Sequence, residues 1–224
     1  MANHSIIYDP AIFEIEGTSL TKYLGSGSYV EIPEGVTEIG EKAFWHLYHV
    51  EEVIIPTTVT RIADLAFCHC HKLRCITIPK SVTEIGYGLF YRCYSLKRAT
   101  VEGPLTRIPE ETFQVCHSLA TVTLPDTLKE IAPTAFFLTD DLKKIALPRG
   151  LTTIGKRAFT SSGLTSLFIP ASVTHIGEGA FSSCNDLICI SCESKSQPEG
   201  WDENWRDRPP WRNERTKVLW GRKK

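Results

Sequence analysis

The sequence predicts an α/β repeat solenoid, a chain wound into stacked coils of nearly equal length. A pattern of 22 or 23 residues recurs seven times, with copies that start at Ile32, Ile55, Ile78, Val101, Leu124, Leu147 and Ile169. Phe fills the thirteenth position of every copy, and Ile fills the eighth. A fixed period in this range is typical of solenoids, because each unit can bury its apolar face only against its neighbours.

The segment before the first copy, residues 1–31, is expected to form an N-terminal capping hairpin. An open solenoid exposes its core and an unpaired strand edge at each end, so both ends need a cover. Apolar residues surround a turn at Gly17, where the chain can reverse. These apolar residues are Phe13, Ile15, Leu20, Tyr23 and Leu24.

Each copy within residues 32–191 is expected to contribute one main strand. The stretch L-x-x-I-x-I-P, for example residues 73–79, alternates apolar and variable positions, which is the pattern of a half-buried strand. Stacked copies would pair these strands into a parallel sheet, and the proline would close each strand because it lacks a donor. A second alternation, residues 82–85, precedes an Ala-Phe pair or its equivalent. This part suits a tight turn or a single helical turn.

Two polar positions of the repeat are expected to be structural. Thr fills the sixth position in six of the seven copies. The seventh position alternates in charge, and opposite charges one coil apart attract each other. The alternating residues are Glu38, Arg61, Glu84, Arg107 and Glu130.

Residues 192–224 are expected to form a tryptophan-rich C-terminal cap and tail. Trp201 and Trp205 are four residues apart, so a short helix would place both on one face over the last coil. Trp220 would follow on a final strand. A tryptophan-rich carbohydrate or peptide site is the alternative for this segment.

The repeat resembles the BspA-like subfamily of bacterial leucine-rich repeats. Segments 13–17, 200–205 and 218–221 are similar to that family's end segments. The resemblance covers nearly the whole chain and implies a curved, right-handed coil used for binding. Some members of the family are large cell-surface adhesins that contact host proteins or other cells.

Length and charge narrow the function classes. The 224 residues carry a net charge of −1, which gives no general attraction to nucleic acid or to an anionic membrane. No stretch approaches the ~18 apolar residues of a membrane span. The first residues lack a basic segment followed by an apolar run, so they do not read as a signal peptide. We expect a cytoplasmic monomer, or a surface or secreted protein if a signal peptide has been removed.

The eight cysteines are expected to be reduced. Four of them occupy the sixteenth position, where stacked side chains point in parallel and cannot pair. They are Cys70, Cys93, Cys116 and Cys184. The stretch 68–71, Cys-His-Cys-His, does not gather the four ligands of a zinc site because Cys70 belongs to the core. We therefore predict no metal and no cofactor, with Cys68, Cys75 and Cys189 exposed to alkylating reagents.

The sequence offers no catalytic residues. A nucleophile needs a base beside it and a group that orients the base. The seven histidines are scattered without a recurring partner, and motifs such as G-x-S-x-G and H-E-x-x-H are absent. A non-enzymatic protein is predicted, and an enzyme is the less favoured alternative.

The exposed positions of the main strands are the candidate binding surface. In chain order they change from acidic to basic and then to neutral or apolar. We predict docking of an unknown protein or peptide on this face, with ordinary solvated side chains and a surface-adhesin domain as the alternatives. The candidate residues are Glu52, Arg74, Lys97, Arg98, Lys143, Lys144 and Phe168.

Overall fold

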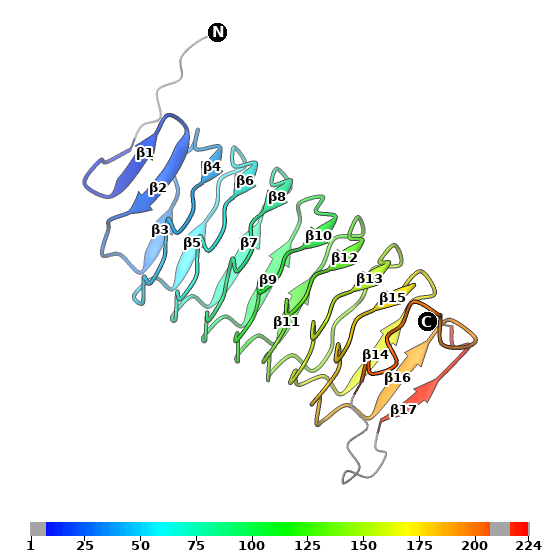
Figure 1. The fold of residues 1–224 in the computed structure, drawn as a ribbon. Coiled ribbons are helices and arrows are strands. Elements are labelled where there is room, and N and C mark those ends of the chain that lie inside the picture. The colour runs from blue at the N-terminus through cyan, green and yellow to red at the C-terminus, as the bar shows by residue number, and fades with distance from the viewer. Residues whose placement is uncertain (1–7, 207–215, 224) are drawn as a thin grey trace.

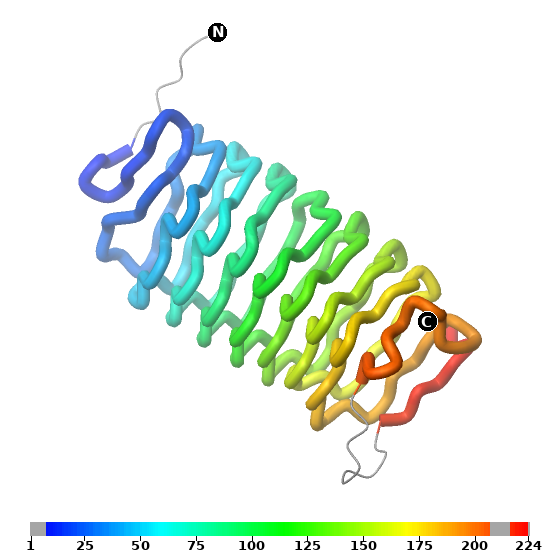
Figure 2. Tube along the Cα trace, in the orientation of Figure 1, coloured from blue at the N-terminus to red at the C-terminus, as the bar shows by residue number. Residues whose placement is uncertain are grey.

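The computed structural model describes residues 8–206 and 216–223. The chain winds into a stack of coils that runs from the N-terminal hairpin at one end to the last strand at the other (Figure 1). The strands of the coils lie on two different faces. The coils have similar size along the stack (Figure 2). The described ranges contain strands and turns and no helix.

The main face is built of parallel strands that follow the predicted L-x-x-I-x-I pattern. They are β3 (Tyr29–Glu31), β5 (Glu52–Ile54), β7 (Cys75–Ile78), β9 (Arg98–Val101), β11 (Thr121–Thr123), β14 (Ser166–Ile169), β16 (Cys189–Cys192) and β17 (Lys217–Leu219). Neighbouring strands pair without a shift between copies, so Cys75 lies beside Arg98 and Arg98 lies beside Thr121. Equivalent positions of successive copies therefore form columns.

The second face is built of two-residue parallel strands from the sixth-to-eighth-position region of the repeat. They are β4 (Glu38–Ile39), β6 (Arg61–Ile62), β8 (Glu84–Ile85), β10 (Arg107–Ile108), β12 (Glu130–Ile131), β13 (Thr153–Ile154) and β15 (His175–Ile176). The eighth-position isoleucines point inward and are buried. These short strands account for the second alternation in the sequence.

The core is a continuous stack of phenylalanine rings. The seven thirteenth-position rings, from Phe44 to Phe181, are buried. Adjacent ring centroids lie 4.8 to 5.7 Å apart. Each ring thus covers the next, which confirms the predicted ladder.

The third side of each coil, which we call the turn side, lacks the helical turn that was considered for it. In every copy the eleventh and fifteenth residues have positive φ, as Lys42 and His46 do in the first copy. Residues in this left-handed region cannot continue a right-handed helix. Two such residues only four positions apart therefore fold the segment into consecutive tight turns.

The N-terminal hairpin covers the first coil. Strands β1 (Phe13–Glu16) and β2 (Ser19–Tyr23) are antiparallel, and β2 pairs in parallel with β4. The Tyr23 ring stacks on Phe44 at 5.4 Å, which extends the phenylalanine ladder. Leu24 was expected in the cap core but is 44% exposed. Tyr23 points inward, and the next side chain of an extended segment points to the opposite side.

The tryptophan-rich segment closes the other end, although without the predicted helix. Trp201 forms a parallel bridge with Ile176 and so extends the second face. Its indole N–H donates to the Val173 carbonyl at 3.0 Å. Trp205 packs edge-on against Phe181 at 5.8 Å. Both tryptophans are buried, so they form a lid rather than an exposed carbohydrate site.

The strand ladders are interrupted once on each face in the described ranges. On the main face, residues 144–147 lie between β11 and β14 without forming a strand. On the second face, the interruption falls between β8 and β10. Near it, Gly103 approaches the preceding coil so closely that a Cβ would come within 2.1 Å of the Val82 carbonyl oxygen.

Candidate binding surface

The main face separates inward from outward side chains along each strand. In β9, Ala99 and Val101 are buried in the core, while Arg98 is exposed. This alternation follows from the opposite directions of successive side chains in a strand. All seven predicted site residues belong to outward or flanking positions and remain wholly or partly exposed.

Two of the five predicted cations already have partners. Arg74 pairs with the Glu51 carboxylate at 3.1 Å. Lys143 pairs with Asp186 at 3.2 Å and also donates to the Asp140 carbonyl at 3.1 Å. These contacts are exposed, so they contribute little to stability and can be exchanged for other carboxylates.

The other three cations are exposed and form no ion pair within the described residues. They are Lys97, Arg98 and Lys144. Lys97 and Arg98 lie on the coil next to Arg74. Lys144 lies two coils beyond Arg98, at a separation of about 10 Å from the usual strand spacing. The structure therefore brings the basic residues into one band, with a neutral coil inside it.

The flanks of this band are more apolar than the sequence had indicated. Glu52 lies beside Tyr29, which is 53% exposed and was not among the candidates. Phe168 is half-buried on β14. Ile188 is 64% exposed at the far end. Tyr29 was missed because β3 precedes the first complete copy, although its alternation with Val30 and Glu31 was visible.

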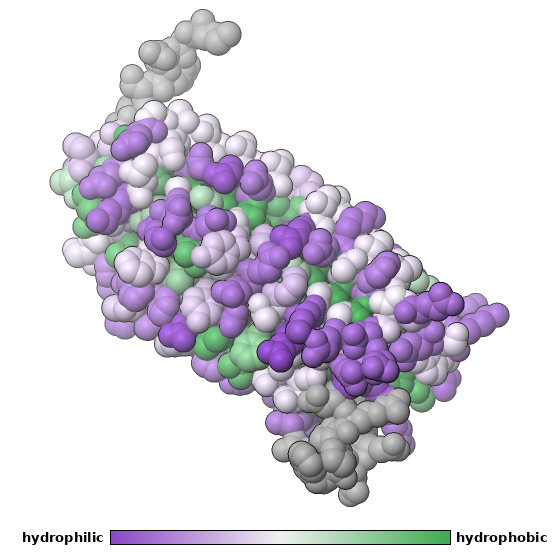
Figure 3. Space-filling view, viewed as in Figure 1, coloured by the Kyte–Doolittle hydropathy of each residue, from purple (hydrophilic) through white to green (hydrophobic). Residues whose placement is uncertain are grey.

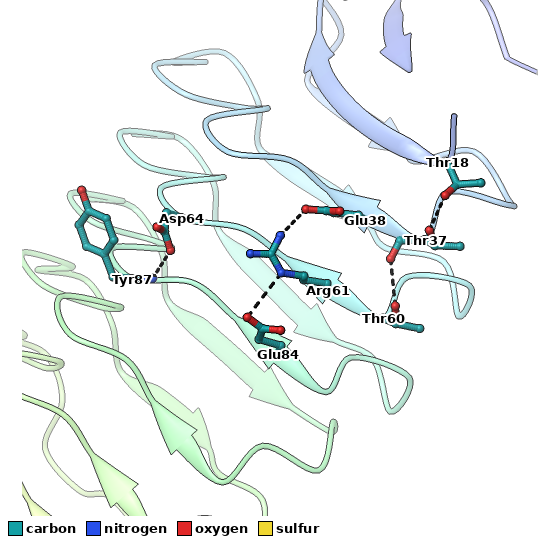
Figure 4. Close-up of polar contacts among 8 residues, drawn as sticks. All are labelled: Thr18, Thr37, Glu38, Thr60, Arg61, Asp64, Glu84 and Tyr87. Carbon is teal, nitrogen blue, oxygen red and sulfur yellow. Dashed lines mark hydrogen bonds and ion pairs between the residues drawn. The ribbon is translucent and has the colours of Figure 1, made fainter. Parts of the chain in front are cut away.

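The polar side chains of the second face form ion pairs and hydrogen bonds within their own columns. Arg61 forms ion pairs with Glu38 and with Glu84, the latter at 3.5 Å (Figure 4). The Thr60 hydroxyl donates to the Thr37 carbonyl at 3.3 Å. These contacts link one coil to the next, so this face serves the stacking of the coils.

The surface as a whole has no large apolar patch on the side that Figure 3 turns to the viewer. Hydrophilic residues cover most of it, and hydrophobic residues show in small separate patches. In the described part of the chain, no helix has the length and apolar character needed to cross a membrane.

The eight cysteines all lie in the described residues and are not joined in disulfides. The buried thiols of the sixteenth position donate to the carbonyl of the phenylalanine one coil earlier, as Cys93 does to Phe67 at 3.1 Å. Burial raises the pKa of Cys70, Cys93 and Cys116 far above its ordinary value. Over the described ranges, no three His, Cys, Asp or Glu side chains are placed to hold one metal ion.

Cys68 corrects the expectation of an accessible thiol. It is only 3% exposed, and burial raises its pKa to about 11. The residue precedes a left-handed position, His69, where the tight turn folds the side chain inward beside Trp45 of the preceding coil. Cys75 is exposed as predicted.

The comparisons with known proteins agree with this architecture. Residues 18–140 and 106–198 match the model of the BspA type leucine rich repeat region, in six copies. The chain is similar to a leucine-rich repeat protein from Bacteroides ovatus, with 27% identity, a TM-score of 0.65, and coverage of 83% of this chain and 55% of that one. It is also similar to a leucine rich cell surface protein from Faecalibacterium prausnitzii, with 28% identity, a TM-score of 0.59, and coverage of 91% and 58%.

A third solved structure, a leucine-rich repeat protein from Eubacterium ventriosum, shares 28% identity at a TM-score of 0.57 and is covered over 47% of its length. The chain thus spans about half the length of each of these proteins. No curated protein matches it. Because the family model matches most of the sequence, this chain belongs to the BspA-type leucine-rich repeat family.

Proposed function

We propose that this protein is a non-catalytic binding module that holds an acidic protein or peptide segment along its main face. The observation that carries the proposal is the band of exposed cations without ion-pair partners in the described residues, Lys97, Arg98 and Lys144. They come from two separate coils. Strand pairing fixes the column of Arg98, and Lys144 is the equivalent residue two copies later in the repeat.

Local charge supports an acidic partner even though the net charge of the chain is only −1. Clustered charges create a local potential that steers oppositely charged partners. Tyr29 and Ile188 add exposed apolar surface on either side of the band. A segment that combines carboxylates with apolar residues at its ends fits this arrangement.

The setting of this binding is proposed to be the cell surface, with the protein acting as a monomer. One solved relative is described as a leucine rich cell surface protein. Capping of both ends of the stack by Tyr23 and by Trp205 favours a single chain over end-to-end association.

A direct test uses a fluorescent peptide of alternating Glu and Leu residues, with binding followed by anisotropy at neutral pH and two salt concentrations. Reversal of two cations, Arg98→Glu and Lys144→Glu, should weaken binding by about tenfold or more and reduce its salt dependence. A matched control, Lys22→Glu and Lys129→Glu, changes the net charge equally at exposed positions away from the main face. Equal loss in both double variants, or no loss in the first, would refute the proposed surface.

A further inference from the structure

The turn side carries a strip of stacked imidazole and phenol rings that belongs to neither face. We call it the turn-side strip. It consists of His46 and His69 from the fifteenth position of the repeat, and of Tyr48, His71, Tyr94 and His117 from the seventeenth. Four of the seven histidines that looked scattered in the sequence are therefore aligned by the stacking of the first four coils.

The rings of the strip contact each other from coil to coil. The seventeenth-position centroids are 4.6 Å apart from Tyr48 to His71, 4.4 Å from His71 to Tyr94 and 5.8 Å from Tyr94 to His117. The fifteenth-position rings, His46 and His69, stack at 4.3 Å. The two columns are joined by His69 Nδ1 and His71 Nε2, at 3.3 Å, and by a hydrogen bond between Tyr48 and His46.

Stacking decides which part of each ring a partner can reach. Rings that stack along the solenoid axis cover each other's faces, so their edges are left for solvent. The edges carry imidazole nitrogens and phenol hydroxyls, which are hydrogen-bonding groups. The strip is therefore a row of polar edges rather than an aromatic platform for the flat face of a sugar.

The charged groups around the strip are mostly cationic. The Arg92 guanidinium lies 5.1 Å from the centre of the Tyr91 ring, and Lys72 directly follows His71. Neither cation forms an ion pair with another described residue, and both are exposed. The carboxylate of Asp140 lies at the far end, where it accepts from His117 Nδ1 at 2.7 Å.

The remaining ionisable neighbours lie beneath or beside the rings. His69 faces His46, His71 and Arg92. His71 faces Tyr48 and Tyr94 as well as His46 and Arg92. Below them, the buried Cys68 thiol interacts electrostatically with Lys42, Arg92 and Glu111.

The balance of these neighbours favours the neutral form of His69 and His71. Burial lowers the pKa of His69 below its usual value, and His46, Arg92 and His71 add to the effect. Burial is also the largest cause that lowers the pKa of His71, and the nearby His46 and Arg92 lower it further. Acidification then adds positive charge to a surface that already carries Arg92 and Lys72, and it turns each protonated ring into a donor at both nitrogens.

We propose that the turn-side strip is a second docking surface, which binds an extended acidic segment of a partner protein under mildly acidic conditions. Carboxylates form charge-assisted hydrogen bonds with protonated imidazoles, and they relieve the repulsion between stacked rings. Four coils span about 14 Å at the usual strand spacing, which matches a few residues of an extended chain. Binding strengthens as pH falls, until the partner's own carboxylates are protonated near pH ~4.3.

The strip differs from the main face in its response to pH. Lysine and arginine keep their charge between about pH 5.5 and 7.5, since their ordinary pKa values lie above 10. Binding through Lys97 and Arg98 is therefore nearly constant over this range. A pH-dependent component identifies the strip, and a constant component identifies the main face.

The test uses the full chain with Arg98→Glu and Lys144→Glu, which removes the main-face contribution, and a fluorescent peptide of ten glutamates. Affinity should be about tenfold higher at pH ~5.5 than at pH ~7.5. This is the change expected if the bound peptide raises the pKa of one histidine by about one unit. Adding His69→Gln and His71→Gln should abolish the increase. Adding His175→Gln, an exposed histidine of the second face, should leave it unchanged.

A second measurement guards against effects of the substitutions on folding. In the unsubstituted protein, the NMR titration of the histidine C2 protons should show higher pKa values for His69 and His71 when the peptide is present, and no change for His175. The proposal is overturned if the peptide leaves these two pKa values unchanged, or if affinity does not rise on acidification. It is also overturned if an uncharged oligosaccharide such as cellohexaose binds the strip more tightly than the glutamate peptide. Loss of binding at pH ~7.5 in the main-face variant tests the proposed function separately.

Discussion

The interior of the solenoid and the exposed main face follow opposite rules, although the same repeats build both. The thirteenth position is Phe in every copy, and each ring packs on the next at 4.8 to 5.7 Å. The outward position at the start of each main strand changes from Glu52 to Cys75, Arg98 and Thr121 in successive strands. Inward residues are fixed by the coil above and below, whereas outward residues meet only solvent or a partner. Folding thus constrains the inward positions of the repeat and leaves the outward positions free to vary.

The largest effect is expected where the interior ladder is broken. Phe113→Ala should lower the free energy of unfolding by about 3–5 kcal/mol, because it opens a cavity between two stacked rings. Phe168→Ala, at a half-buried position of the main face, should cost much less. Chemical denaturation of both variants measures the difference. Similar midpoints would show that the interior ladder and the main face contribute equally to the free energy of unfolding.

Thiol reactivity should also differ between the interior and the exposed main face. Cys75 should react with iodoacetamide at the rate of an exposed thiol, while Cys70, Cys93 and Cys116 should react only when the coils open. Cys68 should behave like the buried group, because its pKa is raised to about 11. Peptide mapping after timed alkylation separates these sites. Rapid labelling of Cys93 in the native protein would contradict a closed core.

A modest effect is expected for acidification of the turn-side strip. A group whose pKa is lowered in the folded state favours unfolding as it becomes protonated, so stability should be greatest above pH ~6.5 and should fall as pH drops through that value. His69→Gln with His71→Gln should reduce this slope. Thermal unfolding at several pH values measures it. A slope that stays the same in the double variant would assign the acid sensitivity to other groups.

The smallest effect is expected for the charges of the second face. Arg61→Met removes the bridge between Glu38 and Glu84 and should change the free energy of unfolding by only about 0–1 kcal/mol, because the pairs are partly exposed. Denaturation at low and high salt provides the measurement. A loss comparable to that of Phe113→Ala would mean that this column stabilises the stack as strongly as the core.

The sequence predicted the solenoid because the apolar positions of the repeat recur in register. It did not reveal the left-handed turns, since positions such as His46, His69 and Val115 lack the Gly or Asn that usually marks them. Positive φ is imposed there by hydrogen bonds to the next coil, as His46 N–H donates to the Cys68 carbonyl at 3.0 Å. The signal for the turn-side strip was present, however, in the seventeenth column of Tyr48, His71, Tyr94 and His117.

The candidate site was predictable only in part. Column positions placed Lys97 and Arg98 together, and the strand register agrees. The ion pairs that occupy Arg74 and Lys143 depend on side-chain geometry, and one of them reaches across two coils to Asp186. Pattern reasoning within a copy has no access to such contacts. Which residues bind a partner stays a prediction.

The two ladder interruptions have a mechanical consequence because they are staggered. The main-face gap at residues 144–147 is spanned on the second face by β12 and β13, which are paired. The second-face gap between β8 and β10 is spanned on the main face by β9 and β11. Because the two gaps lie at different levels of the stack, neither gap allows the coils to separate unless strand pairs on the other face are broken. A pulling force applied to the two ends should meet one continuous structure, with no built-in point of fracture in its middle.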